Sequence, residues 1–426
     1  MIELALFGGP KAIPSPFKRY NPIGAEEVDA AKRVVEGGVL SQFLGCWNPN
    51  FYGGPKVQEF ERDWSTFFGV NYSVTVNSNT SGLIAAIGAI GVEPGNEVIV
   101  SPWTMSASAT AILVWNAIPV FSDIEDETFN LDPACIEKNI TPRTSAIMVT
   151  DIFGHPAEMD TIMALARKHN LKVVEDCAQA PAARYRGRCA GTIADIGVYS
   201  LNYHKHIHTG EGGVCVTNDP ALAERLQLIR NHAEAVVGDK GVTDLANMIG
   251  FNFRMTEIEA AIGVEQLKKL KTLTDIRIGQ ASKLDTGLRK LRGLRTPVVK
   301  DDCSHVYYTY PLIYDAVSTG ATREYVVKAL RAEGVPVSMG YQNLHLLPIY
   351  QKRIAYGRHG FPWSAPFYDG SVSYTKGICP VAEGLQDTRY IGMSMCMNDY
   401  TEQDIDLLIS AFHKVWSNLD RLKELA

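Results

Sequence analysis

The spacing of hydrophobic residues divides the chain into three parts: a helical start, a middle in which strands and helices alternate, and a final part with its own short strands and helices. Apolar residues recur at helical spacing in Glu26–Glu36 and Val57–Phe68, and each of these segments is followed by glycine. From Tyr72 to about Asn218, short apolar runs alternate with helical ones. We therefore predict two amphipathic helices that precede an α/β region.

This alternating region predicts a sheet of seven strands. The strand candidates are Ser73–Val76, Glu97–Val100, Ile118–Phe121, Ala146–Val149, Lys172–Val174, Ile196–Ser200 and Gly213–Val216. Helical signals lie between several of them, at Ser81–Gly91, Ser106–Asn116 and Met159–His169. Strands that alternate with helices favour a largely parallel sheet covered on both faces, which binds ligands at the carboxyl ends of its strands.

A second, smaller domain is predicted after this region. The helical stretch Glu257–Leu273 leads out of it, and the remainder from about Thr274 has its own short strands and a final helix, Glu402–Leu425. We expect a large α/β domain over residues 1–273, which includes the N-terminal segment, and a small α+β domain over residues 274–426.

Composition and charge exclude several classes of protein. A formal net charge of −6 over 426 residues gives no nucleic-acid footprint and no basic membrane-binding surface. The eight cysteines are scattered without paired motifs, which indicates reduced thiols. Neither a signal peptide nor a membrane-spanning apolar run is indicated. We expect a cytoplasmic protein that binds neither nucleic acid nor membrane.

One lysine stands in a setting suited to covalent chemistry. Lys205 follows the apolar segment Ile193–Leu201 and precedes the glycine cluster Thr209–Gly213, where backbone can approach a ligand closely. A lysine in such a loop is either a solvated charge or a Schiff-base nucleophile. Burial would lower the pKa of its ammonium and leave part of it neutral and reactive.

An acid upstream favours the second interpretation. Asp176 closes the apolar run that begins at Val173, where an acid can cap the next helix or bind a ligand. Pyridoxal phosphate needs a lysine for its aldehyde and a carboxylate for its pyridinium nitrogen. Lys205 and Asp176 together therefore indicate this cofactor.

The order of several sequence blocks resembles the DegT/DnrJ/EryC1/StrS family of sugar aminotransferases, which are fold type I pyridoxal-phosphate enzymes. The blocks are Phe60-Glu61, Phe68–Val70, Ser78–Leu83, Glu175–Ala180, Ser200–Gly213 and Gly250–Met255. The resemblance implies a large domain with a mostly parallel seven-stranded sheet flanked by helices, and a smaller C-terminal α+β domain.

The turn after the first predicted strand is the candidate phosphate site. Ser78–Ser81, which includes Asn79 and Thr80, offers hydroxyls, free N–H groups and the positive end of a helix dipole. A plain helix cap is the alternative, and this chain has Asn79 where the family usually has glycine. By resemblance, Ser200 adds a hydroxyl and Asn252 reaches the same phosphate from a neighbouring subunit, which implies a homodimer with composite active sites.

Three further residues are candidates for contact with the cofactor ring. Gln179 lies three residues after Asp176 and is either a surface helix residue or a partner of the ring oxygen or the phosphate. Met105 takes the position where the family usually stacks an aromatic side chain, and Trp103 could supply that stack instead. Both could equally be core residues.

The resemblance implies a transamination in two half-reactions. Lys205 holds the cofactor as an internal aldimine, and the freed lysine then moves a proton as base and acid. Glutamate or glutamine is the expected amino donor, and a nucleotide-linked 3- or 4-keto-hexose is the expected acceptor. The candidate substrate contacts, which are otherwise ordinary surface or interface residues, are Arg254, Tyr341 and His345.

Three further functions remain open on the sequence. The first is a sugar dehydratase with the same cofactor, but the family's dehydratases use histidine where this chain has Lys205, which favours transamination. The second is a cyclitol aminotransferase of the scyllo-inosose type, and the third is a non-catalytic regulator. The pathway class would be polysaccharide or antibiotic biosynthesis.

A row of histidines around the lysine does not complete a metal site. His204, His206 and His208 alternate along the loop, but no carboxylate or cysteine is spaced to join them as a ligand. We therefore expect no metal.

Overall fold

A twisted seven-stranded sheet forms the centre of the large domain. This computed structural model describes residues 3–425. The strands are β1 (Tyr72–Val76), β2 (Glu97–Val100), β3 (Ile118–Phe121), β4 (Thr144–Thr150), β5 (Lys172–Asp176), β8 (Ile196–Ser200) and β9 (Gly213–Thr217). Their order is β1-β9-β8-β5-β4-β2-β3, and every pairing is parallel except those of β9. The predicted fold and all seven predicted strands are confirmed.

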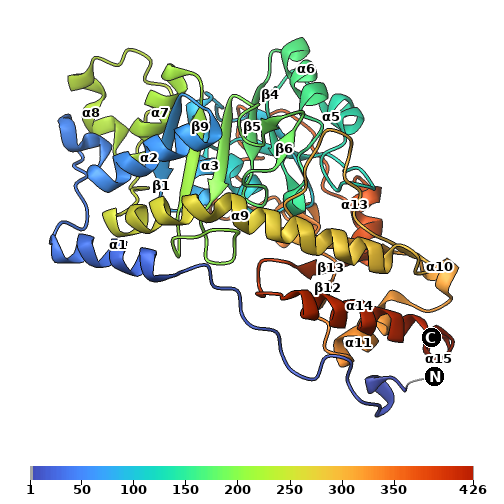
Figure 1. Cartoon of the computed structure of the whole chain (residues 1–426). Coiled ribbons are helices and arrows are strands. Elements are labelled where there is room, and N and C mark those ends of the chain that lie inside the picture. The colour runs from blue at the N-terminus through green and yellow to red at the C-terminus, as the bar shows by residue number, and fades with distance from the viewer. Residues whose placement is uncertain (1–2, 426) are drawn as a thin grey trace.

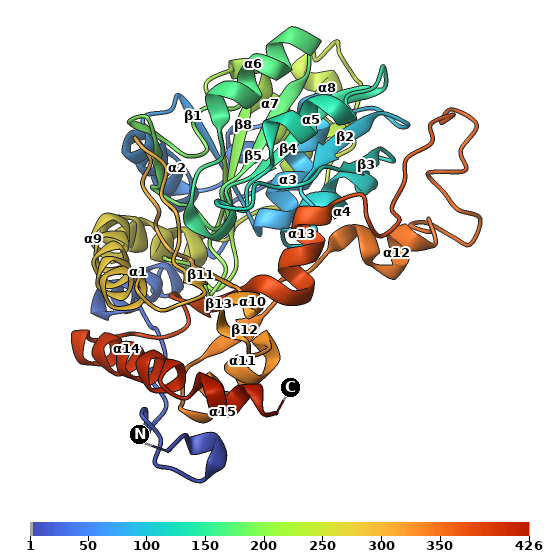
Figure 2. The same ribbon diagram turned by 90° about the vertical axis from the view of Figure 1, so that its right-hand side faces the viewer.

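Helices cover both faces of this sheet (Figures 1 and 2). The helices around it are α2 (Pro55–Phe68), α3 (Asn79–Ala89), α4 (Ala107–Val114), α5 (Pro133–Asn139), α6 (Met159–His169), α7 (Pro220–Arg230) and α8 (Ala233–Lys240), while α1 (Ala25–Glu36) packs on the long helix Glu257–Leu288. Neighbouring residues of β5 show why both faces must be covered. Val174 packs in the same cluster as Leu83 of α3, whereas Val173 packs with Ile162 of α6. Alternate residues of a strand point to opposite faces, so a strand that is apolar throughout needs cover on both.

The long helix α9 connects the two domains. It spans Glu257–Leu288, is 32 residues long, and passes from the large domain to the small one (Figure 1). Thr256 and Glu259 form a capping box at its start. The helix continues past the predicted end at Leu273, because Leu284 and Leu288 belong to the core of the small domain.

The small domain is built on a four-stranded antiparallel sheet. Its strands are β10 (Leu294–Arg295), β11 (Thr309–Tyr314), β12 (Val337–Met339) and β13 (Tyr390–Ser394), in the order β10-β11-β13-β12. Its helices are α10 (Ala316–Thr319), α11 (Arg323–Ala332), α14 (Glu402–Trp416) and α15 (Leu419–Lys423). The predicted final helix is therefore two helices, α14 and α15.

Two segments pack outside the half of the chain to which they belong. Leu4 and Ile13 near the N-terminus lie in the core of the small domain, and both ends of the chain lie at that domain (Figure 1). Conversely, α12 (Pro348–Gln351), α13 (Pro380–Gly384) and the chain between them pack against the core of the large domain. The packing thus does not follow a single cut at residue 273.

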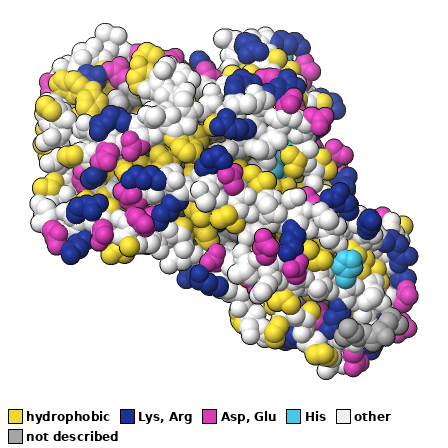
Figure 3. All heavy atoms as spheres, in the orientation of Figure 1, with side chains coloured by type: hydrophobic (Ala, Val, Ile, Leu, Met, Phe, Trp, Pro, Cys, Tyr) yellow, Lys and Arg dark blue, Asp and Glu magenta, His cyan; other side chains and the backbone are white. Residues whose placement is uncertain are grey.

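The surface carries both signs of charge. Figure 3 shows lysine and arginine interspersed with acidic and apolar side chains, and the small domain projecting from the larger body. Among residues 3–425, no helix has the length and hydropathy that a membrane span requires.

Candidate active site

A cavity of about 350 Å³ lies where several strands of the large sheet end. Thr150, Asp176 and Ser200 line it from the last positions of β4, β5 and β8, and Ser78 lines it from just beyond β1. Tyr308 and Tyr341 complete the wall from the second half of the chain. The cavity occupies the carboxyl edge of a parallel sheet, which is the expected place for a ligand.

Lys205 is the buried cation of this cavity. Its side chain is 7% exposed, and Nζ lies 4.2 Å from the centroid of the Tyr308 ring. Among residues 3–425, Nζ has no hydrogen-bond partner. Burial lowers the pKa of Lys205 to about 8, and the opposing attraction of Asp176 only partly offsets this. A substantial fraction of the amine is therefore neutral near physiological pH.

The loop that carries Lys205 is closed by backbone hydrogen bonds. Leu201 N donates to Gly212 O at 2.9 Å, and Thr209 N donates to Leu201 O at 3.0 Å. Gly212 has a φ of 149°, and a Cβ there would lie 2.6 Å from the Thr209 hydroxyl. The glycine cluster thus closes the loop beneath the lysine.

Asp176 is a buried carboxylate with three hydrogen-bond donors. Its Oδ2 accepts from Ser108 Oγ at 2.8 Å, and its Oδ1 accepts from Ala178 N at 3.2 Å and Asn79 Nδ2 at 3.3 Å. Burial raises the pKa of Asp176, while the hydrogen bonds and the charge of Lys205 oppose the rise. A cationic group placed against this carboxylate would favour its ionised form.

The start of α3 forms a cradle suited to a phosphate. Ser78 is its N-cap and accepts from Ser81 N at 3.0 Å, while Asn79 and Thr80 occupy the first turn and line the cavity. Asn79 Oδ1 is buried without a hydrogen-bond partner. A Cβ on Gly213 would lie 2.9 Å from Asn79 N, so β9 supports this turn at close range. Hydroxyls, N–H groups and the helix dipole converge here.

Ser200 and Gln179 also face the cavity. Ser200 ends β8, and its hydroxyl accepts from Asn202 N at 3.3 Å. Gln179 Oε1 accepts from Phe153 N at 2.8 Å, and its Nε2 donates to the Tyr341 hydroxyl at 3.2 Å. Gln179 is therefore a fixed, buried residue rather than a surface one, and it orients Tyr341.

The two ring-stacking candidates occupy different environments. Met105 lines the cavity with 63% of its surface exposed. Trp103 is fully buried and donates from Nε1 to Asn343 Oδ1 at 2.9 Å. Of the two, the structure brings Met105 to the cavity and places Trp103 in the core.

Asn252 and Arg254 do not line the cavity of their own chain. Asn252 is exposed, and its Oδ1 accepts from Arg254 Nε at 2.7 Å. Their loop is fixed beside the cradle, because Asn77 N donates to Phe253 O at 2.8 Å.

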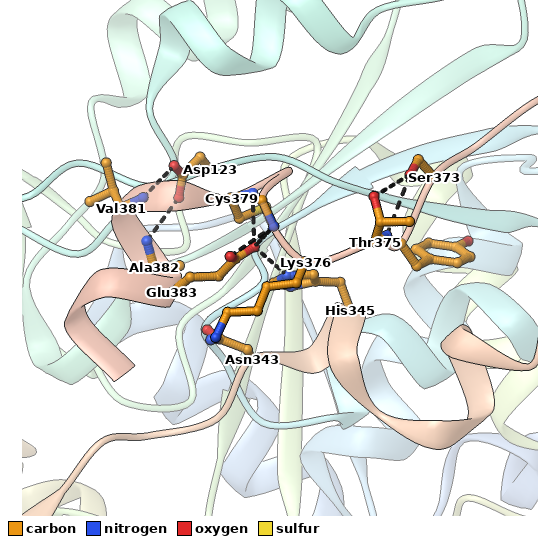
Figure 4. A network of polar contacts seen from close by, with 12 residues as sticks. Asp123, Asn343, His345, Ser373, Thr375, Lys376, Cys379, Val381, Ala382 and Glu383 are labelled. Atoms are coloured by element: carbon orange, nitrogen blue, oxygen red, sulfur yellow. Dashed lines mark hydrogen bonds and ion pairs between the residues drawn. The ribbon is translucent and has the colours of Figure 1, made fainter. Parts of the chain in front are cut away.

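His345 is held in a separate polar network (Figure 4). It is fully buried, with Nε2 2.9 Å from Glu383 Oε1, and it is not among the residues that line the cavity. Glu383 also accepts from Gly377 N at 2.8 Å, and Asp123 accepts from the N–H groups of Val381 and Ala382 (Figure 4). This network fastens α13 to the large domain, so the structure separates His345 from the other candidate substrate contacts.

Several residues at the site have no counterpart among the sequence candidates. Ser108 holds Asp176 from α4, and Lys205 Nζ lies over the Tyr308 ring. His204 and Tyr203 line the wall beside the lysine. The sequence marks His204 only as part of a histidine row, and the contacts of Ser108 and Tyr308 are tertiary, without a local spacing that would signal them.

A group of potential metal ligands lies in the interior. Ligand atoms of Asp151, Glu175 and Cys177 lie within 4.8 Å of one another, all buried. Cys177 Sγ donates to Asp151 Oδ2 at 3.3 Å, and Ala157 N donates to Asp151 Oδ1 at 2.8 Å. Burial and the charge of Glu175 raise the pKa of Asp151, so this acid is favoured in its neutral form.

The cavity fits pyridoxal phosphate at each of its reactive ends. A partly neutral lysine is available for the aldehyde, a buried carboxylate for the ring nitrogen, and the start of α3 for the phosphate. The thioether of Met105 is exposed to the same space.

Comparisons with known proteins identify the family of this chain. The sequence model of the DegT/DnrJ/EryC1/StrS aminotransferase family matches residues 46–377. GDP-perosamine synthase of Caulobacter vibrioides is 35% identical over 91% of this chain and 98% of its own. The L-glutamine:2-deoxy-scyllo-inosose aminotransferase of Streptoalloteichus tenebrarius is 32% identical over 84% and 86%. DesI, solved in the presence of its TDP-sugar product, superposes with a TM-score of 0.80 at 26% identity, over 99% and 97%.

Proposed function

The chain belongs to the DegT/DnrJ/EryC1/StrS aminotransferase family, and we propose that this pyridoxal-phosphate-dependent aminotransferase carries an amino group from glutamate or glutamine to a keto-sugar. The preferred acceptor in this proposal is a nucleotide-linked 3- or 4-keto-hexose. The observation that carries the proposal is the buried pair of Lys205 and Asp176 in one cavity with the N-terminus of α3.

Lys205 and Asp176 have complementary roles in this proposal. Bound pyridoxal phosphate supplies an aldehyde that takes up the amino group and a ring that stores the electrons released at the donor carbon. Lys205, with its pKa lowered to about 8, is neutral often enough to bind that aldehyde and, once released, to move a proton. Asp176 keeps the ring nitrogen protonated, and Ser108 holds the carboxylate in place.

The remaining cavity residues bind and orient. Ser78, Thr80 and Ser200 offer hydroxyls to the phosphate, and the free N–H groups at the start of α3 add to them. Met105, exposed in the cavity, packs against the ring plane, and Gln179 bonds the ring oxygen or the phosphate. Tyr341, oriented by Gln179, presents its hydroxyl to the substrate.

We also propose a homodimer in which Asn252 and Arg254 serve the site of the partner. Asn252 is exposed, and neither residue lines the cavity of its own chain. Their loop is nevertheless anchored next to the phosphate cradle through Asn77. An anchored polar loop at the mouth of a site is suited to completing a second site across a two-fold axis.

Two acceptor classes have support among the relatives. The likeness to GDP-perosamine synthase supports a nucleotide-linked sugar. The likeness to the 2-deoxy-scyllo-inosose aminotransferase supports a cyclitol ketone as the alternative. The nucleotide-linked sugar is the preferred class, because GDP-perosamine synthase has the higher identity and coverage of the two relatives, 35% over 91% of this chain against 32% over 84%.

A two-stage assay tests the proposal. The holoenzyme is treated with glutamate or glutamine, and the absorption of the cofactor should shift as the donor half-reaction proceeds. After the donor is removed, keto-sugar nucleotides and cyclitol ketones are added separately, and the correct acceptor should restore the original spectrum and yield an amino product by mass spectrometry. A protein whose spectrum responds to neither donor would contradict the proposal.

A further inference from the structure

A row of aromatic rings connects Lys205 with Arg19. The Tyr308 ring lies under Lys205 Nζ at 4.2 Å, and the His204 ring meets it edge-on with centroids 5.9 Å apart. Tyr203 stacks on His204 at 5.1 Å and an interplanar angle of 23°. The guanidinium of Arg19 lies 5.7 Å from the centroid of the Tyr203 ring.

Arg19 is an exposed cation with its guanidinium free for a ligand. Among residues 3–425, its side chain has neither a hydrogen-bond acceptor nor an ion-pair partner. The neighbouring Lys18, in contrast, is paired with Asp399 at 2.7 Å. The segment itself is fixed, because the Tyr20 hydroxyl donates to His206 O at 2.6 Å. An ordered backbone thus holds an uncommitted positive charge beside the cavity.

The rings between Arg19 and Lys205 are suited to contact with a ring-shaped ligand. Tyr203 is 49% exposed, so much of it is open to a ligand. Burial and the charge of Lys205 lower the pKa of His204 to about 4, so its ring is neutral at physiological pH. Neutral aromatic faces pack against the C–H faces of sugars and against nucleobases through apolar contact.

We propose that Arg19 and Tyr203 form a subsite for a phosphoryl group that the acceptor carries away from its reacting carbonyl. This inference rests on the proposed function. Arginine binds phosphate oxygens with two parallel N–H donors, and its stacking on Tyr203 leaves the edge of the guanidinium free for such a pair. Arg19 contacts Tyr203 of the wall but is not among the residues that line the cavity around Lys205, so an anion bound by Arg19 lies away from the carbonyl that is aminated. A free cyclitol ketone, which has no phosphoryl group, would leave this subsite unused.

Binding of diphosphates to the holoenzyme tests the subsite. Titration calorimetry with UDP, GDP, dTDP and inorganic pyrophosphate should detect binding to the parent protein. Arg19→Gln should weaken it about 10-fold or more, the usual effect of losing a charged hydrogen-bond pair. Lys18→Gln is the matched control, because Lys18 is 77% exposed and pairs with Asp399. It should bind diphosphates as the parent does.

The pyrophosphate arm identifies the source of the recognised anion. Nucleoside diphosphates that bind more tightly than pyrophosphate, with both weakened by Arg19→Gln, would support a nucleotide-linked acceptor. Equal affinities, both weakened by Arg19→Gln, would support the subsite for a simple sugar phosphate. Unchanged binding in Arg19→Gln, or an equal loss in Lys18→Gln, would overturn the subsite.

The donor half-reaction separates this inference from the proposed function. It is followed on the same parent preparation through the cofactor spectrum. If the parent converts the donor and Arg19→Gln binds diphosphates as tightly as the parent, the proposed function stands and the subsite is overturned. A parent that fails with both donors contradicts the proposed function, whatever the calorimetry shows.

Discussion

Lys205 Nζ lies 4.2 Å from the centroid of the Tyr308 ring, so the charge of the lysine rests on an aromatic face rather than on a paired carboxylate. Such a face stabilises an ammonium by about 0.5–2 kcal/mol, much less than a buried ion pair partner would. It positions Nζ without holding its proton tightly. This setting agrees with a lysine whose pKa is lowered to about 8.

Substitution of Tyr308 should move the pKa of Lys205 further down. Tyr308→Leu removes the aromatic face and keeps the burial, so the pKa should fall by about half a unit to one and a half units. The rate at which the cofactor-free protein takes up pyridoxal phosphate, measured against pH, reports the neutral amine. Its midpoint should lie near pH 8 in the parent and lower in Tyr308→Leu.

Tyr308→Phe is the control for that prediction. Phenylalanine keeps the ring face and lacks the hydroxyl, so its midpoint should stay close to that of the parent. If Tyr308→Phe and Tyr308→Leu lower the midpoint equally, the hydroxyl and not the ring face sets the pKa of Lys205.

Asp176→Asn should slow the donor half-reaction. The amide can still accept a hydrogen bond from Ser108, whose Oγ lies 2.8 Å from Asp176 Oδ2, but it cannot keep a ring nitrogen protonated. We expect a loss of about 10- to 100-fold or more, the scale of a charged hydrogen bond. Stopped-flow absorbance with glutamate or glutamine measures the rate, and an unchanged rate would exclude Asp176 from this role.

Trp103 and Met105 should respond differently to substitution. Trp103→Phe leaves the buried Asn343 Oδ1 without its donor, so the free energy of unfolding should fall by about 1–3 kcal/mol. Met105→Ala alters a side chain that is 63% exposed, so stability should change by less than about 0.5 kcal/mol.

Affinity for the cofactor should fall more in Met105→Ala than in Trp103→Phe, the reverse of the expected effects on stability. Met105→Ala should weaken the affinity for pyridoxal phosphate several-fold, the scale of a sulfur–aromatic contact of about 0.3–1.5 kcal/mol. Denaturant unfolding and cofactor titration measure the two effects. A Trp103→Phe protein of normal stability that binds the cofactor poorly would instead assign the ring contact to Trp103.

The buried His305 should make stability depend on pH. Burial holds the pKa of His305 well below 6.5, and its Nδ1 accepts from Tyr307 N at 2.9 Å. Below pH 6.5 the unfolded chain binds a proton here that the folded protein does not, so stability is lost as the pH falls. The slope is up to about 1.4 kcal/mol per pH unit.

His305→Asn isolates this contribution, because asparagine supplies an acceptor that does not titrate. Denaturant unfolding of parent and variant at pH 7.5, 6 and 5 should show a gap in stability that changes as the pH falls, with the parent losing more. Parallel curves would mean that His305 does not contribute to the dependence. Other titrating groups act alike in both proteins and cancel in the difference.

Local sequence patterns predict the secondary-structure elements and the site residues that stand at the ends of those elements. The seven strands follow apolar runs, and Lys205 and Asp176 stand where those runs end. The predicted end of α9 is wrong, because the helix changes partners midway, and Leu284 packs in the small domain rather than the large one. The apolar residues of α9 therefore move to a different face of the helix partway along, and in the sequence this change looks like the end of the helix.

Tertiary contacts account for what the sequence does not predict. Ser108 lies 68 positions from Asp176, and neither residue marks the other by spacing. His345 meets Glu383 across 38 positions, and this pairing removes it from the cavity. Tyr308 reaches Lys205 only because the segment before β11 packs against the large domain.

The most direct test of the account asks which lysine holds the cofactor. Borohydride reduction of the holoenzyme fixes pyridoxal phosphate on the side chain that binds it, and peptide mapping by mass spectrometry then identifies that residue. The account predicts a single modified peptide that contains Lys205, with the label absent from Lys205→Ala. Modification of another lysine, or a label that persists in Lys205→Ala, would contradict it.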